Sequence, residues 1–443
     1  HFDTAEFGNL PYTQYGRGTN GLVYQQLLVS LPALTEDELS LLSIYTLVAT
    51  ELGLGKQSYL QVQARQSQVC GGISAYTTMR GGINNEQETQ AFLVLSSKAL
   101  LRNASDQSQL MRDTFEQLRF DEHDRLKELI AQLKGRRESA VTGNGHSLAM
   151  SAASAAMSPI AKVNEDLGGL SGIRQLKLLA KRIDDKSSLA NLANELAAIH
   201  QKMLSSNKQL LIIAENDQLQ SLCADIGPIW QDFNAVASEG FELPALRGIN
   251  KEFWLANSQV NFCAKAYPTV ASGHPDAPVL SVFAVYLRNG FLHRAIREQG
   301  GAYGGGASQD SNIAAFRFYS YRDPRLQETL NDFDKSITWM LTTPVSAQGL
   351  EEAILGVVGS IDKPGSPAGE AKQDYHSNIF GRTIAERRQF RQRVLAVSAE
   401  DLLRVCETYF TNAEASIAIV SNETKADALA DWIAQEGLSI QRL

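Results

Sequence analysis

The sequence predicts an α+β protein made of two domains of similar size. Its 443 residues, 44% of them hydrophobic and 20% charged, have the composition of an ordinary globular protein of two or three domains. The order of the predicted elements in the first half recurs in the second half. In each half a glycine pair leads into a strand, and these pairs, Gly71-Gly72 and Gly300-Gly301, lie 229 residues apart. Two domains of about 220 residues explain this pattern better than three unequal ones.

The first domain is predicted over residues 1–238. Val23–Val29 is rich in β-branched and apolar residues, which is typical of a strand. Thr35 and Glu38 form a capping box that opens a helix. Apolar residues that recur every three or four positions predict a long helical region over residues 106–157. The full set, in chain order, is a strand at 23–29, helices at 36–52 and 59–68, a strand after Gly72, a strand at 90–96, the helical region, a helix at 192–203 and a strand at 209–214.

A linker is predicted at residues 239–254, because this stretch contains glycine and proline, has mixed polarity and shows no clear period. The second domain follows over residues 255–443. Its elements are a strand at 259–266, a long helix at 278–297, a strand at 314–321, helices at 326–341 and 347–360, a helical region at 385–409, a strand at 416–420 and a closing helix at 425–435. The two halves resemble each other in element order more than in residue identity, which is the weaker of the two signals of a repeat.

The composition argues against several classes of function. The net charge is −8 and no large basic patch occurs, so nothing indicates a nucleic-acid partner. No run of about 18 apolar residues marks a membrane span. The four cysteines lie far apart without a Cys-x-x-Cys pair, and we expect them to be reduced core residues. The chain begins at His1 without signal-peptide features, so we expect a piece of a longer polypeptide.

The familiar catalytic motifs are missing. The glycine-rich run Gly300–Gly306 is not a phosphate loop, because the predicted helix precedes the glycines and a strand follows them. Such glycines let the backbone turn sharply or let another chain approach closely. His-Glu-x-x-His, His-x-x-Glu-His and Gly-x-Ser-x-Gly are all absent. We therefore predict no metal ligands and no serine nucleophile in this chain.

One constellation remains at the second glycine pair. Arg297 lies at the predicted end of a helix and Tyr303 at the start of a strand, on either side of Gly300-Gly301. A guanidinium donates several hydrogen bonds and a phenol donates one, so the two side chains could hold a peptide carbonyl and stabilise a developing oxyanion. The alternative is a capping arginine and a packing tyrosine.

The same segment carries a family resemblance. Residues 292–306 read LHRAIREQGGAYGGG, and residues 316–324 read FRFYSYRDP. Both resemble the C-terminal half of the pitrilysin/insulinase family of zinc peptidases, and its presequence-protease branch in particular. Further matches in the same order extend the resemblance over most of the chain, at residues 2–7, 10–12, 71–74, 143–147, 168–169 and 361–364.

This resemblance implies a specific architecture and site. Family members consist of four homologous α/β-roll domains, each a sheet packed with helices, in two bowl-shaped halves that close around a chamber for unfolded peptides. This chain would be the third and fourth domains. Zinc would be bound by His-x-x-Glu-His in the N-terminal half, which this chain lacks. By motif match, Arg297 and Tyr303 would bind substrate near the scissile bond, and Gly300, Gly301 and Gly304 would admit the substrate backbone.

Two hypotheses follow from the resemblance and from what the chain lacks. In the first, this chain is the C-terminal half of a zinc endopeptidase that degrades unfolded peptides, its partner being the N-terminal half of the same polypeptide. In the second, it is a separate inactive subunit that pairs with a zinc-bearing chain, or a scaffold subunit of the same fold. Under both hypotheses we expect the isolated chain to bind no stoichiometric zinc and to cleave no peptide.

Overall fold

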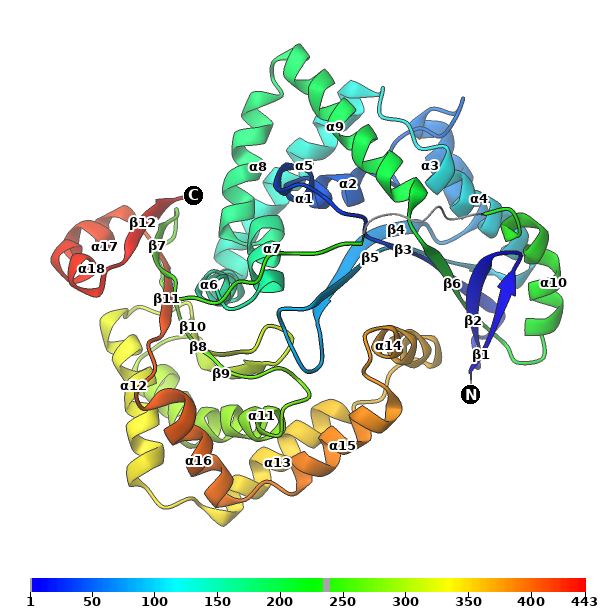
Figure 1. Ribbon diagram of the computed structural model, residues 1–443. Coiled ribbons are helices and arrows are strands. Elements are labelled where there is room, and N and C mark those ends of the chain that lie inside the picture. The colour runs from blue at the N-terminus through cyan, green and yellow to red at the C-terminus, as the bar shows by residue number, and fades with distance from the viewer. Residues whose placement is uncertain (1, 234–239) are drawn as a thin grey trace.

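The computed structural model describes residues 2–233 and 240–443, and its strands form two six-stranded mixed sheets (Figure 1). The first sheet has the order β1-β2-β6-β3-β5-β4 and the second the order β12-β7-β11-β8-β10-β9. Each sheet is packed with helices, so the α+β class predicted from the sequence is confirmed. Within the described ranges, no helix is long and apolar enough to cross a membrane.

The first sheet is antiparallel except where β2 runs parallel to β6. Its strands are β1 (Phe2–Phe7), β2 (Leu10–Gly16), β3 (Leu22–Ser30), β4 (Ile73–Gly81), β5 (Thr89–Leu100) and β6 (Lys208–Ala214). The helices of this half are α1 (Glu36–Ser40), α2 (Leu42–Val48), α3 (Tyr59–Val69), α4 (Ala104–Glu116), α5 (His123–Gly143), α6 (Gly145–Ser154), α7 (Pro159–Gly168), α8 (Leu170–Arg182), α9 (Lys186–Ser205) and α10 (Leu219–Trp230).

In the second sheet, β7 runs parallel to both β11 and β12, and the other neighbours are antiparallel. Its strands are β7 (Lys251–Leu255), β8 (Phe262–Pro268), β9 (Gly304–Asp310), β10 (Ala315–Tyr321), β11 (Ser416–Ser421) and β12 (Ser439–Arg442). The helices are α11 (Asp276–Leu287), the π-helical segment η2 (Arg288–Gln299), α12 (Gln327–Thr342), α13 (Ala347–Ile361), α14 (Pro367–Ile379), α15 (Ile384–Leu395), α16 (Ala399–Phe410), α17 (Glu423–Ala428) and α18 (Ala430–Glu436).

Several elements differ from the sequence prediction. The helix predicted at 36–52 divides into α1 and α2, and the helical region at 106–157 divides into α4, α5 and α6. Strand β7 begins at Lys251, inside the segment predicted as a linker, because Phe253 and Trp254 are buried. The predicted boundary between residues 238 and 239 lies outside the described residues. The division into two domains at that boundary stays a prediction.

Each sheet has a principal hydrophobic core formed with helices of its own half. The opposite faces are covered by helices from the other half. Helix α6 of the first half packs on the second sheet through Ala149, Ala152 and Ala153. Helix α14 of the second half packs on the first sheet through Ala371 and Tyr375, and Figure 1 shows it lying apart from its neighbours α13 and α15. The two halves therefore complete each other's packing.

Candidate functional site

The candidate site lies where a helix turns into the terminal strand of the second sheet. Helix α11 continues into η2, which ends at Gln299, and the chain then turns at Gly300-Gly301 and enters β9. Gly301 has φ +79°, a left-handed conformation that a side chain rarely adopts. A Cβ on Gly300 would lie 2.5 Å from the backbone carbonyl oxygen of Ile296. Both glycines are therefore required by the turn itself, whatever else they do.

The structure places Arg297 and Tyr303 on either side of this turn, and both side chains are exposed. The Tyr303 side chain is 68% exposed. Its ring stands edge-on to Tyr321 with centroids 5.5 Å apart, and its backbone N–H donates to the Tyr321 carbonyl at 3.0 Å. No hydrogen bond or ion pair reaches the Arg297 guanidinium or the Tyr303 hydroxyl from any residue that the structure describes. Both donors are thus available to a ligand, and their catalytic role stays a prediction.

The glycines predicted to admit a substrate backbone differ in their surroundings. A Cβ on Gly304 would meet nothing within 4 Å, so there is open space above the start of β9. A Cβ on Gly305 would lie 2.7 Å from Cγ2 of Ile296, because η2 packs under that part of the strand. The glycine at position 304 therefore leaves room for a ligand, whereas the glycine at position 305 is needed for the internal packing.

Tyr303 is supported through Tyr321 by groups that were not apparent as site residues from the sequence. His146, at the start of α6, lies against the rings of Tyr319 and Tyr321 with centroids 5.7 Å and 4.7 Å away. Burial lowers the pKa of His146. The hydroxyl of Tyr321 donates to the carbonyl of Gly143 at 3.3 Å. The segment Gly143–Ser147 matches the family pattern, but a sequence match alone cannot place a residue of the first half beside β10.

Arg322 is a second residue at the site that the sequence analysis missed. It has φ +49°, which is unusual for a residue with a side chain. Its guanidinium lies over the Tyr321 ring, 5.6 Å from the centroid. The next residue, Asp323, is fully buried and exchanges two backbone hydrogen bonds of 2.8 Å with Asn261. These bonds hold the chain in the conformation that carries Arg322 toward Tyr303.

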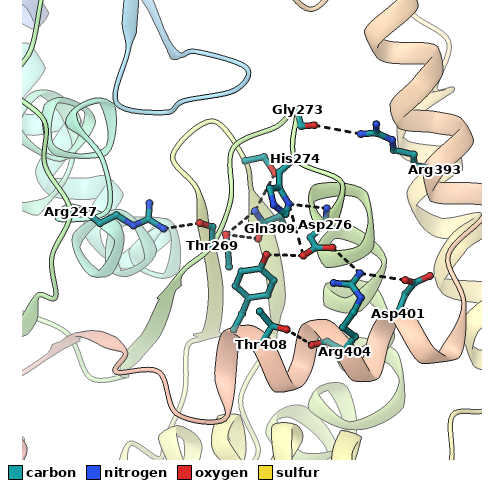
Figure 2. A network of polar contacts seen from close by, with 12 residues as sticks. Arg247, Thr269, Gly273, His274, Asp276, Gln309, Arg393, Asp401, Arg404 and Thr408 are labelled. Atoms are coloured by element: carbon teal, nitrogen blue, oxygen red, sulfur yellow. Dashed lines mark hydrogen bonds and ion pairs between the residues drawn. The ribbon is translucent and has the colours of Figure 1, made fainter.

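A polar network at the opposite end of α11 fixes the helix that leads to the site (Figure 2). The Asp276 carboxylate accepts hydrogen bonds of 2.7 Å from Arg404 Nη2 and from the Tyr409 hydroxyl. Burial alone would raise the pKa of Asp276, but these hydrogen bonds and the Arg404 charge lower it. The ionised carboxylate therefore ties the start of α11 to α16.

The residues that the structure describes do not fit a metal site. Among residues 2–233 and 240–443, no group of three or more histidine, cysteine, aspartate or glutamate side chains is placed to hold a metal ion. Of the seven histidines, His146 and His200 lie among aromatic rings, whereas His274 and His293 each lie near a single carboxylate, that of Asp276 and that of Glu298. The chemistry that this site offers consists of hydrogen-bond donors and a cation.

Comparison with protein families matches both halves of the chain. The family model for the domain associated with subfamily C of the M16 peptidases matches residues 2–179, and the "PreP C-terminal domain" model matches residues 251–423. The solved structure of pitrilysin superposes with a TM-score of 0.65 at 12% identity, covering 99% of this chain and 45% of pitrilysin. The chain therefore belongs to the M16 peptidases, the pitrilysin/insulinase family of zinc metallopeptidases.

Within this family, the sequence is similar to presequence proteases. It is 28% identical over 398 residues to the mitochondrial presequence protease of Yarrowia lipolytica, and 27% identical over 428 residues to that of Danio rerio. These alignments cover 89% and 91% of this chain but only 40% and 41% of the relatives. The chain thus spans about two fifths of the length of the curated relatives it matches, and the match to the PreP C-terminal model places it in their C-terminal part.

A shorter solved structure is also similar. The structure described as "peptidase M16 inactive domain" from Pseudomonas fluorescens superposes with a TM-score of 0.65 at 13% identity. Here the match covers 95% of this chain and 98% of that chain.

Proposed function

We propose that this chain is the half of a zinc-dependent endopeptidase that does not bind zinc, and that it supplies substrate-binding groups to a site completed by a zinc-bearing half. The complete enzyme degrades unfolded peptides inside a closed chamber. The observation that carries the proposal is the pair Arg297 and Tyr303, which the fold holds on both sides of one turn with their donor groups unpaired within the described part of the chain.

The chemistry of this pair suits peptide hydrolysis. Attack on a peptide carbonyl moves negative charge onto its oxygen, and donors that face this oxygen stabilise the transition state more than the ground state. The Arg297 guanidinium and the Tyr303 hydroxyl are two such donors. In the complete enzyme, zinc would activate water and polarise the carbonyl, and closure of the two halves would bring both donors to the substrate. Gly300, Gly301 and Gly304 would line the path of the substrate backbone.

The proposal is tested in the polypeptide that joins this chain to its zinc-bearing half. We expect Arg297→Ala and Tyr303→Phe each to lower kcat for a fluorogenic peptide by about 100- to 1000-fold, the range for loss of one oxyanion donor. Zinc content, measured by metal analysis after dialysis, should stay at the wild-type level. Because both side chains are exposed, the melting temperature should also stay unchanged.

Arg294→Ala is the matched control, since Arg294 is an exposed arginine one helical turn before Arg297. It should retain nearly normal turnover. Near-normal turnover in both Arg297→Ala and Tyr303→Phe would reject the assigned role. A loss of turnover accompanied by loss of zinc would instead indicate damage to the other half.

A second candidate function is favoured by one comparison. The Pseudomonas fluorescens structure described as an inactive domain matches this chain over nearly its whole length. The alternative is therefore a separate inactive subunit that pairs with a zinc-bearing chain, or a scaffold subunit of the same fold. Reading the gene upstream of His1 distinguishes the two: an in-frame His-x-x-Glu-His supports the single polypeptide, and a start codon directly before this segment supports the subunit.

A further inference from the structure

Strand β4 occupies in the first sheet the place that β9 occupies in the second. Each is the terminal strand of its sheet, and each follows a glycine pair whose second member has a positive φ, +98° at Gly72 and +79° at Gly301. The positions 229 residues before Arg297 and Tyr303 are Gln68 and Ser74. The first sheet therefore repeats the strand but not the arginine and tyrosine of the candidate site.

The register of the first sheet shows which backbone groups of β4 face away from it. The N–H of Gly82 donates to the carbonyl of Glu88 at 2.7 Å, in the register that pairs Gly81 with Thr89. Because hydrogen bonding alternates along an antiparallel pair, the even-numbered residues of β4 bond to β5 and the odd-numbered ones face outward. The outward groups of Ile73, Ala75 and Thr77 thus lie along one open edge.

These outward groups are almost all unpaired in the part of the chain that the structure describes. The Ile73 N–H donates to Oε1 of Gln66 at 3.4 Å, and no hydrogen bond reaches the outward N–H or C=O of Ala75 or Thr77. Beyond Thr78 the edge is less open, because Met79 packs near α6 and α7. The available edge is therefore the stretch from Ile73 to Thr78.

This edge lacks the features that usually protect an exposed strand. Native proteins guard edge strands with lysine, proline, bulges or inward-pointing charge. Residues 73–79 read ISAYTTM and contain no charge and no proline, while tyrosine and threonine favour extended structure. Tyr76 is 38% exposed on the face beside the edge. An unguarded edge of this kind is a template for pairing with another extended chain.

Positive charge flanks the open stretch. Arg80 ends it on the same face as Tyr76, and Lys98 on β5 lies against Gly71, just before its start. Lys372 on α14 lies farther in, with Nζ 4.9 Å from the centroid of the Tyr24 ring on β3. Of the nearby carboxylates, Asp374 pairs with Arg387, while Asp310 pairs with Arg317 at 3.3 Å and also interacts electrostatically with Arg80. The charge around the edge therefore favours an acidic ligand.

We propose that the β4 edge is a non-catalytic docking strand, on which an extended, acidic stretch of a peptide pairs with the outward backbone groups of Ala75 and Thr77. Binding through the backbone tolerates many sequences, and the side chains alternate between the two faces. The proposal rests on the proposed function for its ligand class, an unfolded peptide. It adds a second contact that could hold one part of a long peptide while another part reaches Arg297 and Tyr303.

The test uses this 443-residue chain and a fluorescein-labelled peptide of about ten residues, alternating threonine and valine and ending in two glutamates. Hydrogen exchange at single-residue resolution should show fast exchange at the amides of Ala75 and Thr77 in the free chain and slowing by about tenfold or more on peptide addition. The amides of Tyr76 and Thr78 should be slow in both states. Unchanged exchange at Ala75 and Thr77 with peptide bound would overturn the proposal.

Backbone and charge variants sharpen the test. Thr77→Pro removes one outward N–H and should weaken peptide binding about tenfold, whereas Thr77→Val keeps the N–H and should bind like the wild type. If Thr77→Pro fails to fold, two N-methylated peptides provide the test instead, one methylated at the odd positions and the other at the even positions. Only every second N–H of an added strand faces β4, so one of these peptides should lose binding and the other should keep it. Equal binding of both sets would reject strand pairing.

The acidic preference is tested by replacing the two glutamates with lysines, which should weaken binding several-fold. Arg80→Gln should reduce the difference in affinity between the glutamate peptide and the lysine peptide. Arg136→Gln, at an exposed arginine on α5, should leave this difference unchanged. Light scattering could instead show a concentration-dependent dimer, with the amides of Ala75 and Thr77 already slow to exchange without peptide. That result would assign the edge to a second copy of the chain and overturn the proposal. Since hydrolysis is not measured, failure here leaves the Arg297 and Tyr303 test unaffected.

Discussion

Glu165 places a carboxyl group inside the first half of the chain, with 2% of the residue exposed. Its Oε1 accepts the Ser171 N–H at 2.9 Å, while Oε2 is buried without a hydrogen-bond partner among the described residues. Burial raises the pKa of Glu165 to about 7, and the hydrogen bonds from Ser171 and Ser151 offset this only in part. Gly169 makes the arrangement possible, since a Cβ there would lie 1.8 Å from Oε2.

We expect Glu165→Gln to stabilise the protein at alkaline pH. The folded pKa lies above the unfolded value near 4.5, so this group's contribution to stability is complete below pH 4.5 and is lost as the pH rises through 7. Glutamine has the same shape and does not ionise. The free energy of unfolding at pH 8, measured by urea denaturation, should rise by about 1–3 kcal/mol and change little at pH 5.

Asp166→Asn is the matched control, because Asp166 is the neighbouring acid and pairs with Lys162 near the surface. It should leave the pH dependence of wild-type stability in place. If Glu165→Gln and the wild type lose stability equally between pH 5 and pH 8, the buried carboxyl is not the group that titrates.

At the scale of single elements, α14 joins the two halves through both apolar and polar contacts. Ala371 is fully buried against the first sheet. The Tyr15 hydroxyl donates to Oδ2 of Asp374 at 2.9 Å, and His376 Nε2 lies 2.8 Å from Oε1 of Gln26. Burial lowers the pKa of His376 to about 4, and the charges of Arg80 and Lys372 contribute to this shift. The docked helix therefore requires a neutral histidine.

We expect the docking of α14 to weaken in mild acid. The docked pKa near 4 lies below the free value of 6.5, so docking is fully favoured above pH 6.5 and loses stability as the pH falls from 6.5 toward 4. Hydrogen exchange of the α14 amides, compared at pH 7 and pH 5 after correction for intrinsic rates, should show this loss. The glutamine in His376→Gln cannot titrate, so this variant should show a smaller change in α14 exchange between pH 7 and pH 5. An equal change in the variant and the wild type would contradict the assignment of the pH effect to His376.

The elements differ in how far the sequence could predict them. Strands β3 and β6 and helix α3 were predicted nearly in full, because a buried strand and a capped amphipathic helix each carry a local signal. For strand β9 only the start was predicted, at Tyr303, and its extent was not, because glycines disfavour strands and its extended form depends on pairing with β10. Helix α14 was also missed, although its packing on a sheet in the other half of the chain is clear in the structure.

The candidate site shows the same limit. Arg297 and Tyr303 were found because they are close in sequence and match a family pattern. His146 and Arg322 were not, because they reach the site through the docking of α6 on β10 and through a left-handed backbone conformation held by Asp323. Neither long-range docking nor local strain can be read from residue types alone.

At the scale of the whole molecule, each half lends one helix to the sheet of the other half: α6 packs on the second sheet and α14 packs on the first. This exchange of helices makes the two sheets depend on each other. We expect a fragment of residues 1–240 to expose the apolar face that α14 covers, which includes Tyr15, Leu28, Val94, Leu211 and Ile213. It should bind a hydrophobic dye and self-associate in light scattering, and co-expression with residues 241–443 should restore a soluble complex. A monomeric, dye-negative fragment as stable as the intact chain would contradict this dependence.

The exchange of helices also sets an order of events during synthesis. Strand β6 completes the first sheet at Ala214, but α14 ends only at Ile379, 165 residues later. At about 5–20 residues per second, the ribosome needs roughly 8–33 seconds to make that stretch. During this interval the apolar face of the first sheet has no helix from its own chain to cover it. The nascent chain is then open to capture by a chaperone, and synonymous codon changes between these positions would alter how long that state lasts.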